Sequence, residues 1–315
     1  MATVSVVIVS WNAAGPLASC LGRLPAEADE VIVVDNASTD GSADLVAHSF
    51  PWVRLLRQTT NLGFAGGVNA GAAAAHGDHL LLLNSDAEAD AGAIRRLGRF
   101  LDERPDAGAV AGRLVNADGS TQRGWNVRRL PTVAGLAAEL LLIDRLWPGN
   151  PWRRHRLALD LDEGAPTEVE QPAAACLMVR RSAFERVGGF DERFFPAWFE
   201  DVDFCRRFRA AGEHIWFLPD ARFRHRGGVA RDRLGRAAFA VAWHGNLVRY
   251  VDLHHGALAR LAIRGATVVG LGLRVAACLA SGDRDGARAY RGAMAGTLSS
   301  WRTRGVRRRE ANRSG

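Results

Sequence analysis

Three carboxylates stand within four positions of one another at Glu200, Asp201 and Asp203, and aromatic residues such as Phe199 and Phe204 flank them. Like charges near apolar surface raise one another's pKa, which is how a protein prepares a general base. The alternative is that Asp201 only caps a helix while the other two carboxylates face water. The segment is therefore a candidate general-base site.

A second candidate follows the apolar run 31–34, where Asp35 and Asp40 enclose a stretch of amide and hydroxyl side chains. In an open α/β sheet, ligands bind at the carboxyl ends of the strands. A carboxylate at that point can accept hydrogen bonds from a nucleobase N–H or from ribose hydroxyls. The other interpretation is a polar turn in which Asp40 or Ser42 caps the next helix.

A third candidate is the sequence Asn84-Ser85-Asp86, which follows the apolar run 80–83. Mg²⁺ is usually bound by one or two carboxylates plus substrate phosphates, and Mn²⁺ accepts the same oxygen ligands. A single aspartate after a strand can also be a helix cap. His225 stands among three arginines, and its neutral imidazole could complete a metal site unless it is a solvated or core residue.

The glycine-rich stretch 61–71 opens a predicted helix and contains Asn61, Gly67 and Asn69. Backbone N–H groups without side chains around them could approach a phosphate. The stretch matches neither the dinucleotide fingerprint nor the Walker pattern, and tight packing of helix on sheet explains the glycines equally well.

Short apolar runs separated by alanine-rich segments position these residues, and they predict a wound α/β sheet. The predicted strands are residues 4–9, 30–34, 53–56, 79–83, 109–114 and 174–180. A helix is expected from Ser182 to the glycine pair at 188–189, and another from Asp201. Its buried stripe would comprise Phe204, Cys205, Phe208 and Ala211. Proline and glycine punctuate residues 123–171, which predicts an irregular insertion.

The chain has 315 residues, of which 48% are hydrophobic and 24% charged, and this composition excludes disordered, collagen-like and disulfide-scaffold proteins. All 41 basic residues are arginines, and the formal charge is +7. From Arg260 onward, twelve arginines against three acidic residues give +9, which leaves −2 for residues 1–259. The basic charge is therefore concentrated at the C-terminus.

The C-terminal part, from Ala237, is predicted to be all-helical. Arg264 and Arg274 interrupt the apolar stretch 261–280, so we predict no transmembrane helix. On a helix these two residues and Arg260 fall within a sector of about 80°, which suits a helix in the headgroup region of a membrane. A packing helix with a frayed charged end is the alternative. The four scattered cysteines and the lack of a secretory leader predict a cytoplasmic protein.

Taken together, the five segments resemble the family 2 glycosyltransferases from about Val4 to about Gly228. The segments with this resemblance are VSVVIVSWN, VDNASTDGS, NLGFAGGVN, LLNSD and GGFDERFF followed by FEDVDF. Within the family, Asp118-Gly-Ser, Arg129-Leu-Pro-Thr132 and the Glu-Asp-Val-Asp segment resemble the rhamnosyltransferase branch. The resemblance implies a single A-type, nucleotide-sugar-binding α/β domain over residues 1–235. A basic helical extension over residues 236–315, with a candidate membrane surface, would follow.

The resemblance also implies roles. The nucleotide-sugar pocket would comprise Ser10, Asn12, Asp35, Asp40, Asn61, Gly67, Asn69, Asn84, Ser85 and Asp86. Asp86 would bind the Mn²⁺ or Mg²⁺ that bridges the donor diphosphate, with His225 as a further metal or phosphate ligand. Asp201 would be the base for the acceptor hydroxyl, and Glu200 would orient the acceptor. Many relatives have a D-x-D motif at the position of residues 84–86. In this chain the first aspartate of the motif is replaced by Asn84, so only Asp86 offers a carboxylate.

An inverting transfer is therefore expected, with dTDP-rhamnose as the favoured donor. The acceptor would be a glycan or a polyprenyl-diphosphate-linked sugar at the inner face of the cell membrane. Relatives often have Trp and Gly where residues 171–175 stand, beside the sugar pocket. Two other functions stay open: a nucleotidyltransferase acting on sugar phosphates, and a protein that binds nucleic acid through its arginine tail. No reader motif is present, so nucleic acid is not expected as a partner.

Overall fold

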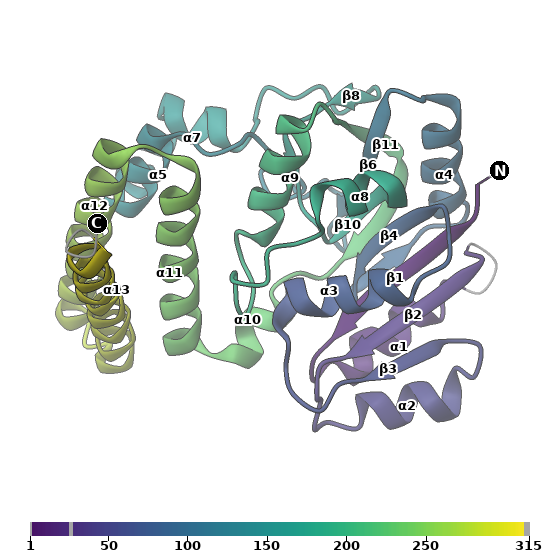
Figure 1. Ribbon diagram of the computed structural model, residues 1–315, viewed down its shortest axis with the longest axis horizontal. Helices are drawn as coiled ribbons and strands as arrows, with labels where there is room; N and C mark the ends of the chain where they lie inside the picture. Colours follow the sequence, from purple (N-terminus) through teal and green to yellow (C-terminus); the bar gives the residue numbers. More distant parts are fainter. Residues whose placement is uncertain (1, 25–27, 312–315) are drawn as a thin grey trace. The chain divides into compact units, whose positions relative to one another are not determined.

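The computed structural model describes residues 2–24 and 28–311, with side chains up to residue 298. The chain divides into two compact units (Figure 1). The α/β unit comprises Met1–Leu130 and His155–Ala230, and the helical unit comprises Pro131–Arg154 and Arg231–Gly315. The stretch Pro131–Arg154, from the middle of the predicted insertion, thus groups with the C-terminal helices. The predicted division at residue 235 treated it as part of the catalytic domain.

A single large sheet forms the centre of the α/β unit, with the strand order β3-β2-β1-β4-β10-β6-β11-β5. Its strands are β1 (Val4–Ser10), β2 (Glu30–Asp35), β3 (Arg54–Arg57), β4 (His79–Asn84), β5 (Ala87–Ala89), β6 (Ala107–Val115), β8 (Thr167–Glu168), β10 (Cys176–Arg180) and β11 (His214–His225). The first four strands in that order are parallel, whereas β10 runs antiparallel to both β4 and β6. All six predicted strands are confirmed.

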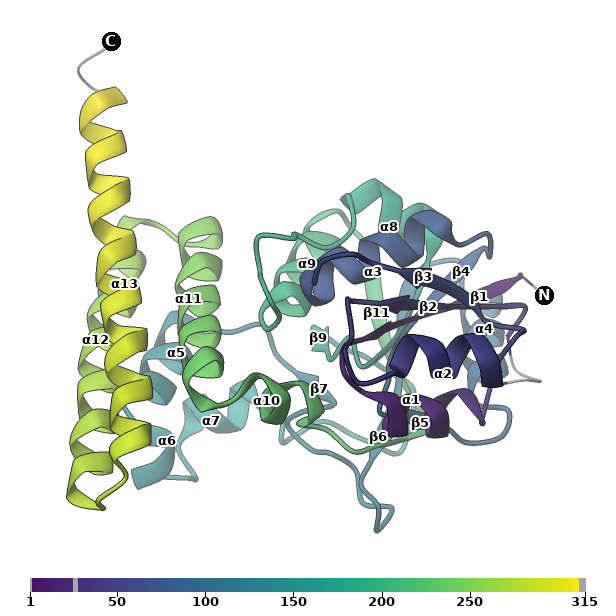
Figure 2. The ribbon, with the colours of Figure 1, turned by 90° about the horizontal axis from the view of Figure 1, so that it is seen from below.

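Helices cover both faces of this sheet (Figure 2). One face packs against α1 (Ala14–Leu21), α2 (Ser42–Ser49) and α4 (Ala93–Glu103), and the other against α3 (Gly63–Ala74), α8 (Arg181–Val187) and α9 (Glu200–Ala210). Successive side chains of a strand point to opposite faces, so Val6 and Ile8 of β1 enter the first core while Val7 enters the second. This two-sided burial explains the consecutive apolar residues of the central strands.

Part of the region predicted to be irregular is ordered as a small second sheet. Its strands are β7 (Val127–Arg128) and β9 (Gln171–Pro172), which pair antiparallel with Arg128 opposite Gln171. A short turn at residues 116–121 precedes it and closes with a bridge between Val115 and Thr121. Two-residue strands are too short for any periodicity in the sequence to reveal.

The helical unit contains α5 (Val133–Leu140), α6 (Ile143–Leu146), α11 (Arg236–His254), α12 (Ala257–Ala280) and α13 (Arg284–Ala311), which confirms the predicted all-helical C-terminal part. The chain passes between the units three times: after Leu130, within α7 (Pro151–Arg156) and within α10 (Val229–Leu234). Ala240, Leu271 and Ala293 form a small core shared by the three long helices. Helix α12 packs against α5, α11 and α13.

The arginines of α12 do not form the outward stripe that the sequence predicted. Arg264 donates two hydrogen bonds to the Asp252 carboxylate on α11, at 2.9 and 2.7 Å. Arg274 donates to the carbonyls of Leu140 and Glu139 at the end of α5. Both arginines therefore point into the helical unit, because it supplies acceptors for them, and the outer face of α12 is left apolar.

By length and composition, α12 could cross a membrane: its most apolar stretch has a mean hydropathy of 1.5 and is 28% buried. A single helix of this kind is weak evidence for a span. The two arginines, each bonded to a polar group of another helix, favour the prediction that it does not cross.

Candidate functional site

Asp86 and His225 are far apart in the sequence, but the sheet brings them together. Asp86 follows β4, and His225 ends β11. The backbone N–H groups of Arg226 and Gly227 bond to the Asp86 carbonyl and carboxylate, at 3.1 and 3.0 Å. His225 Nε2 then lies 3.3 Å from Asp86 Oδ1, with the two side chains 11% and 7% exposed. The two predicted metal ligands are thus neighbours in the structure.

Gln122, which the sequence analysis did not single out, determines which nitrogen of His225 faces Asp86. Its Nε2 donates to the His225 carbonyl at 2.7 Å and to Asn116 Oδ1 at 3.1 Å. Its Oε1 must therefore be the atom that lies 2.9 Å from His225 Nδ1, and Nδ1 must carry the proton. In the neutral ring, the lone pair of Nε2 then points toward the Asp86 carboxylate.

Two acceptor atoms that face each other need a proton or a cation between them. Among the described residues no cluster of three or more His, Cys, Asp and Glu side chains could hold a metal ion. One carboxylate and one imidazole, completed by substrate phosphates and water, nevertheless fit Mn²⁺ or Mg²⁺. Asn84 lies beside Asp86 and His225, with its amide Nδ2 3.4 Å from His225 Nε2. It therefore contacts the histidine through its NH₂ group and adds no carboxylate to the pair. Ser85 is partly exposed next to it.

The paired carboxylates Glu200 and Asp201 begin α9, after Phe199 in a left-handed conformation with φ 73°. Glu200 is only 6% exposed, and burial together with the neighbouring Asp201 charge raises its pKa well above the usual range. Asp203 is also buried and bonds to Arg207 at 2.7 Å. The interpretation in which Glu200 and Asp203 face water is therefore wrong. Asp201 Oδ1 accepts from the Val202 N–H at 2.8 Å.

The small β7–β9 sheet supplies two neighbours of Asp201 that sequence reasoning missed. Gln171 Nε2 donates to Asp201 Oδ2 at 3.2 Å, and the Arg128 guanidinium lies 3.6 Å from the same oxygen. In the sequence, Gln171 stands out only as a departure from the family pattern. Arg128 stands in an arginine-rich segment with no distinguishing spacing, so the sequence held no signal for it.

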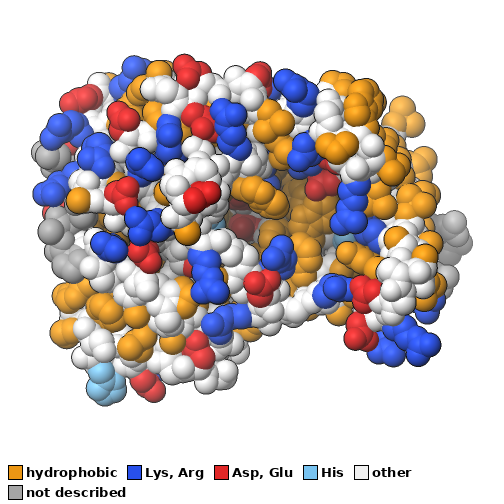
Figure 3. Space-filling view, turned by 180° about the vertical axis from the view of Figure 1, so that it is seen from behind, with side chains coloured by type: hydrophobic (Ala, Val, Ile, Leu, Met, Phe, Trp, Pro, Cys, Tyr) orange, Lys and Arg blue, Asp and Glu red, His pale blue; other side chains and the backbone are white. Residues whose placement is uncertain are grey.

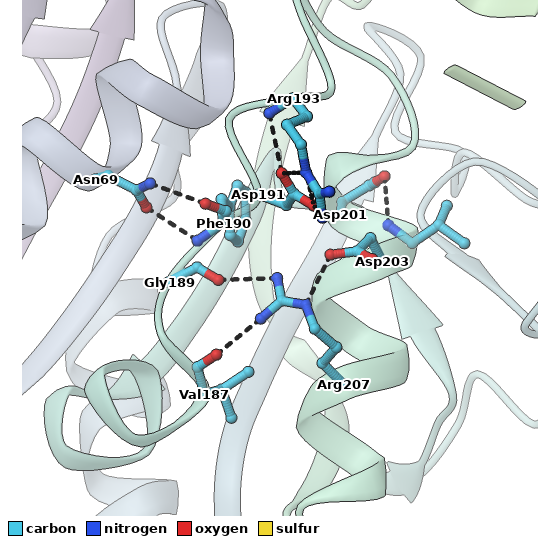
Figure 4. A network of polar contacts seen from close by, with 10 residues as sticks. Asn69, Val187, Gly189, Phe190, Asp191, Arg193, Asp201, Asp203 and Arg207 are labelled. Carbon is cyan, nitrogen blue, oxygen red and sulfur yellow. Dashed lines mark hydrogen bonds and ion pairs between the residues drawn. The ribbon is translucent and has the colours of Figure 1, made fainter. Parts of the chain in front are cut away.

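A network of polar contacts fixes the segment that leads into α9 (Figure 4). Arg207 donates to the Val187 and Gly189 carbonyls, at 2.8 and 2.9 Å. Asn69 of α3 exchanges two hydrogen bonds with the Phe190 backbone, each 2.9 Å, and also donates to Glu192. The side chain of Asn69, predicted to line the nucleotide-sugar pocket, thus ties this segment to α3. Ala211, predicted to be buried, lies beyond the end of α9 and is exposed.

Ser10 and Asp35 lie opposite each other at the carboxyl ends of β1 and β2. Both are buried, and within the described residues neither Ser10 Oγ nor Asp35 Oδ1 has a hydrogen-bond partner. A buried polar atom without a partner costs about 1–3 kcal/mol, so its presence calls for an explanation. A ligand that offers an N–H or O–H group to this strand end would satisfy the carboxylate.

Asn12 and Asp40 organise the loops around that strand end. Asn12 Oδ1 accepts from the Thr39 N–H at 2.7 Å. Asp40 accepts from the N–H groups of Ala14 and Ser42, each at 3.0 Å, at the starts of α1 and α2. Asp40 therefore bonds to the first turns of two helices, although the N-cap residue of α2 is Gly41 rather than Asp40 or Ser42.

The glycine-rich stretch packs tightly against protein. A Cβ at Gly67 would lie 2.7 Å from Val9 Cγ1 of β1, so helix and sheet meet too closely for a side chain. Asn61 Oδ1 accepts from the Gly63 N–H at 2.8 Å, and the Phe64 N–H donates to the Pro196 carbonyl at 2.7 Å. These contacts favour the packing explanation of the glycines over a phosphate cradle at the start of α3.

Solved structures share this fold. The chain aligns with a crystal structure of GalNAc-T7 with UDP, GalNAc and Mn²⁺ at a TM-score of 0.56 and 16% identity, covering 80% of this chain and 48% of the other. It aligns with a mannosyltransferase from Pyrobaculum calidifontis in complex with GDP-Man and Mn²⁺ at 0.53 and 18% identity, covering 94% and 84%. The predicted A-type glycosyltransferase fold is therefore confirmed.

Sequence comparison identifies the family. A 256-residue alignment gives 32% identity to an N-acetylglucosaminyl-diphospho-decaprenol L-rhamnosyltransferase of Mycobacterium tuberculosis, over 75% of this chain and 80% of the relative. A low-salt glycan biosynthesis hexosyltransferase of Haloferax volcanii is 26% identical over 67% of this chain and 62% of the relative. Residues 5–188 match the model for glycosyl transferase family 2. These findings decide against the nucleotidyltransferase alternative, and the chain belongs to glycosyl transferase family 2.

Proposed function

We propose that this enzyme transfers L-rhamnose from dTDP-rhamnose to a sugar hydroxyl of a polyprenyl-diphosphate-linked acceptor, with inversion at the anomeric carbon. The relative from Mycobacterium tuberculosis, named for this transfer to a decaprenol-linked sugar, supports the choice of donor and acceptor. The observation that carries the proposal is the distance of 3.3 Å between Asp86 Oδ1 and His225 Nε2, the nitrogen that Gln122 leaves without a proton in the neutral ring. Two acceptor atoms so arranged suit a cation shared with a donor diphosphate.

Inversion requires a base on the face of the sugar opposite the diphosphate. Asp201 is the base in this proposal: it removes the proton from the acceptor hydroxyl as that oxygen attacks the anomeric carbon. Gln171 and Arg128 hold Asp201 Oδ2, which fixes the direction of the carboxylate. The raised pKa of Glu200 favours its protonated form beside Asp201, and in that form it can orient the acceptor without a second negative charge.

The donor is held at two places in this proposal. The nucleobase lies at the ends of β1 and β2, where the unpartnered Asp35 Oδ1 accepts an N–H hydrogen bond. The diphosphate lies at Asp86 and His225, with Asn84 and Ser85 beside them. A divalent cation at these residues would neutralise charge on the departing diphosphate. Because the acceptor is lipid-linked, the enzyme would work at the inner face of the cell membrane as a peripheral protein.

Donor binding by the purified protein tests this proposal. Calorimetric titration should use dTDP-rhamnose, UDP-galactose, UDP-glucose and GDP-mannose, each with and without Mn²⁺. We expect tight binding of dTDP-rhamnose alone, weakened when Asp86→Asn removes the carboxylate. Preference for another nucleotide sugar would overturn the choice of donor, and equal binding with and without Mn²⁺ would overturn the metal site.

A further inference from the structure

One side of α12 is exposed and carries only apolar or small residues along its whole length. The large exposed side chains are Leu258, Leu261, Val269, Leu273 and Leu279, and the small residues Ala262, Gly265 and Ala276 lie between them. We refer to these eight residues as the apolar face of α12. Leu258 is 85% exposed and Leu261 70%. Figure 3 shows hydrophobic side chains grouped over the helical unit, at the right of the view.

Such a face is unusual on a protein that is surrounded by water on all sides. The 24 residues of α12 extend for about 36 Å at 1.5 Å per residue. Contiguous apolar patches beyond a few hundred Å² are rare on monomeric soluble proteins and mark sites of interaction with proteins or membranes. The apolar face of α12 therefore needs an occupant.

The charged residues of α12 show how this face stays apolar. The helix contains three charged residues, and each has a partner within the helical unit. Arg264 is bonded to Asp252, Arg274 to α5 carbonyls, and Arg260 to the His255 carbonyl at 2.7 Å. A helix that crossed a bilayer would bring these polar groups into hydrocarbon. The arrangement suits a helix that lies along a membrane with one side in the lipid and the other on the protein.

Helix α13, packed against α12, presents positive charge. Arg284, Arg288 and Arg291 are exposed at spacings of four and three residues, which places them on one side of that helix. Only Asp285, which pairs with Arg288, adds a negative charge to α13 between residues 284 and 298. Exposed arginines on the helix that packs against α12 match the anionic headgroups of a lipid surface, and the apolar face matches its acyl chains.

We propose that the apolar face of α12 enters the outer part of an anionic lipid bilayer, with the α13 arginines on the headgroups. This inference deepens the proposed function, on which it rests for one point: a lipid-linked acceptor would be delivered from the same surface. It corrects the predicted mode of attachment, in which the α12 arginines themselves faced the lipid.

Vesicle flotation tests the inference. The full-length protein should float with vesicles of phosphatidylcholine and phosphatidylglycerol, and much less with phosphatidylcholine alone. Leu261→Glu and Val269→Glu, which place charges on the apolar face, should each lower the bound fraction at least about tenfold. Val241→Glu, at an exposed valine of α11 in the same unit, is the matched control and should float like the wild type. Arg288→Gln with Arg291→Gln should weaken binding to anionic vesicles only.

Two results would overturn the inference. One is unchanged flotation of both apolar-face variants. The other is a dimer in light scattering that Val269→Glu converts to a monomer, because a second copy of the chain would then cover the face. Titration of the same variants with dTDP-rhamnose separates this question from the proposed function. Variants that lose flotation should bind the donor like the wild type, whereas failure of donor binding in the wild type would count against the function alone.

Discussion

Gln122 and His225 hold each other through two hydrogen bonds, from Gln122 Nε2 to the His225 carbonyl and from His225 Nδ1 to Gln122 Oε1. The pair leaves His225 Nε2 as the nitrogen that faces Asp86. A metal-binding histidine commonly has its other nitrogen fixed in this way, which sets the tautomer and the orientation of the ring.

We therefore expect Gln122→Leu to lower affinity for Mn²⁺ by about 10-fold to 100-fold, because the imidazole can then turn or change tautomer. Electron paramagnetic resonance of Mn²⁺ in the presence of dTDP measures this without turnover. Asn116→Ala removes the other acceptor of Gln122 Nε2 but leaves the histidine contacts, so it should bind Mn²⁺ nearly as the wild type does. Equal affinity in Gln122→Leu and wild type would show that Gln122 does not position the ligand.

Arg128 and Gln171 give a second prediction. Arg128→Gln should lower kcat by about 10-fold to 100-fold with little change in the KM for the donor, because it disturbs the direction of the Asp201 carboxylate. Arg129→Gln is the control: this neighbouring arginine pairs with Asp160 instead. A rise in donor KM with unchanged kcat would instead place Arg128 at the donor.

The raised pKa of Glu200 predicts a pH-dependent stability. In the unfolded chain this carboxyl loses its proton near its ordinary pKa, whereas in the folded protein it keeps the proton to higher pH. The free energy of unfolding therefore falls by about 1.4 kcal/mol for each pH unit between the unfolded and the folded pKa. Below the unfolded pKa, Glu200 causes no such loss. Glu200→Gln removes the titration, so its stability relative to wild type should increase from pH 5 to pH 8 in denaturant unfolding. A constant difference across that range would contradict the raised pKa of Glu200.

Close packing of α3 on β1 predicts a contrast between two glycines. Gly67→Ala should destabilise the protein by about 1–3 kcal/mol, because its Cβ would lie 2.7 Å from Val9 Cγ1. Gly245→Ala in α11 has open space around it and should cost nothing. Thermal unfolding of the two variants measures the difference. Full stability of Gly67→Ala combined with loss of donor binding would instead favour the phosphate-cradle explanation.

The wound sheet could be predicted from the sequence because its central strands are buried on both faces and are apolar at consecutive positions. The short strands β7 and β9 could not, since two residues have no periodicity. The same limit hid Arg128 and Gln171 as neighbours of Asp201, because their position depends on that pairing.

For α12, periodicity correctly placed the arginines on one side of a helix but could not tell which side faces inward. The side that faces inward is determined by hydrogen-bond acceptors on other helices, namely Asp252 of α11 and the carbonyls at the end of α5. The proximity of Asp86 and His225 was expected only through the family resemblance. In physical terms it follows from the position of β11 in the sheet and from the bonds of Arg226 and Gly227 to Asp86.

The measurement that tests the central claim most directly is rhamnose transfer by Asp201→Asn. The assay would use dTDP-rhamnose and a polyprenyl-diphosphate-linked N-acetylglucosamine. We predict that this variant binds the donor as tightly as the wild type but transfers sugar at least about 100-fold more slowly, because only the base is removed. Transfer at the wild-type rate would contradict the assignment of Asp201 as the base, and with it the account of the site.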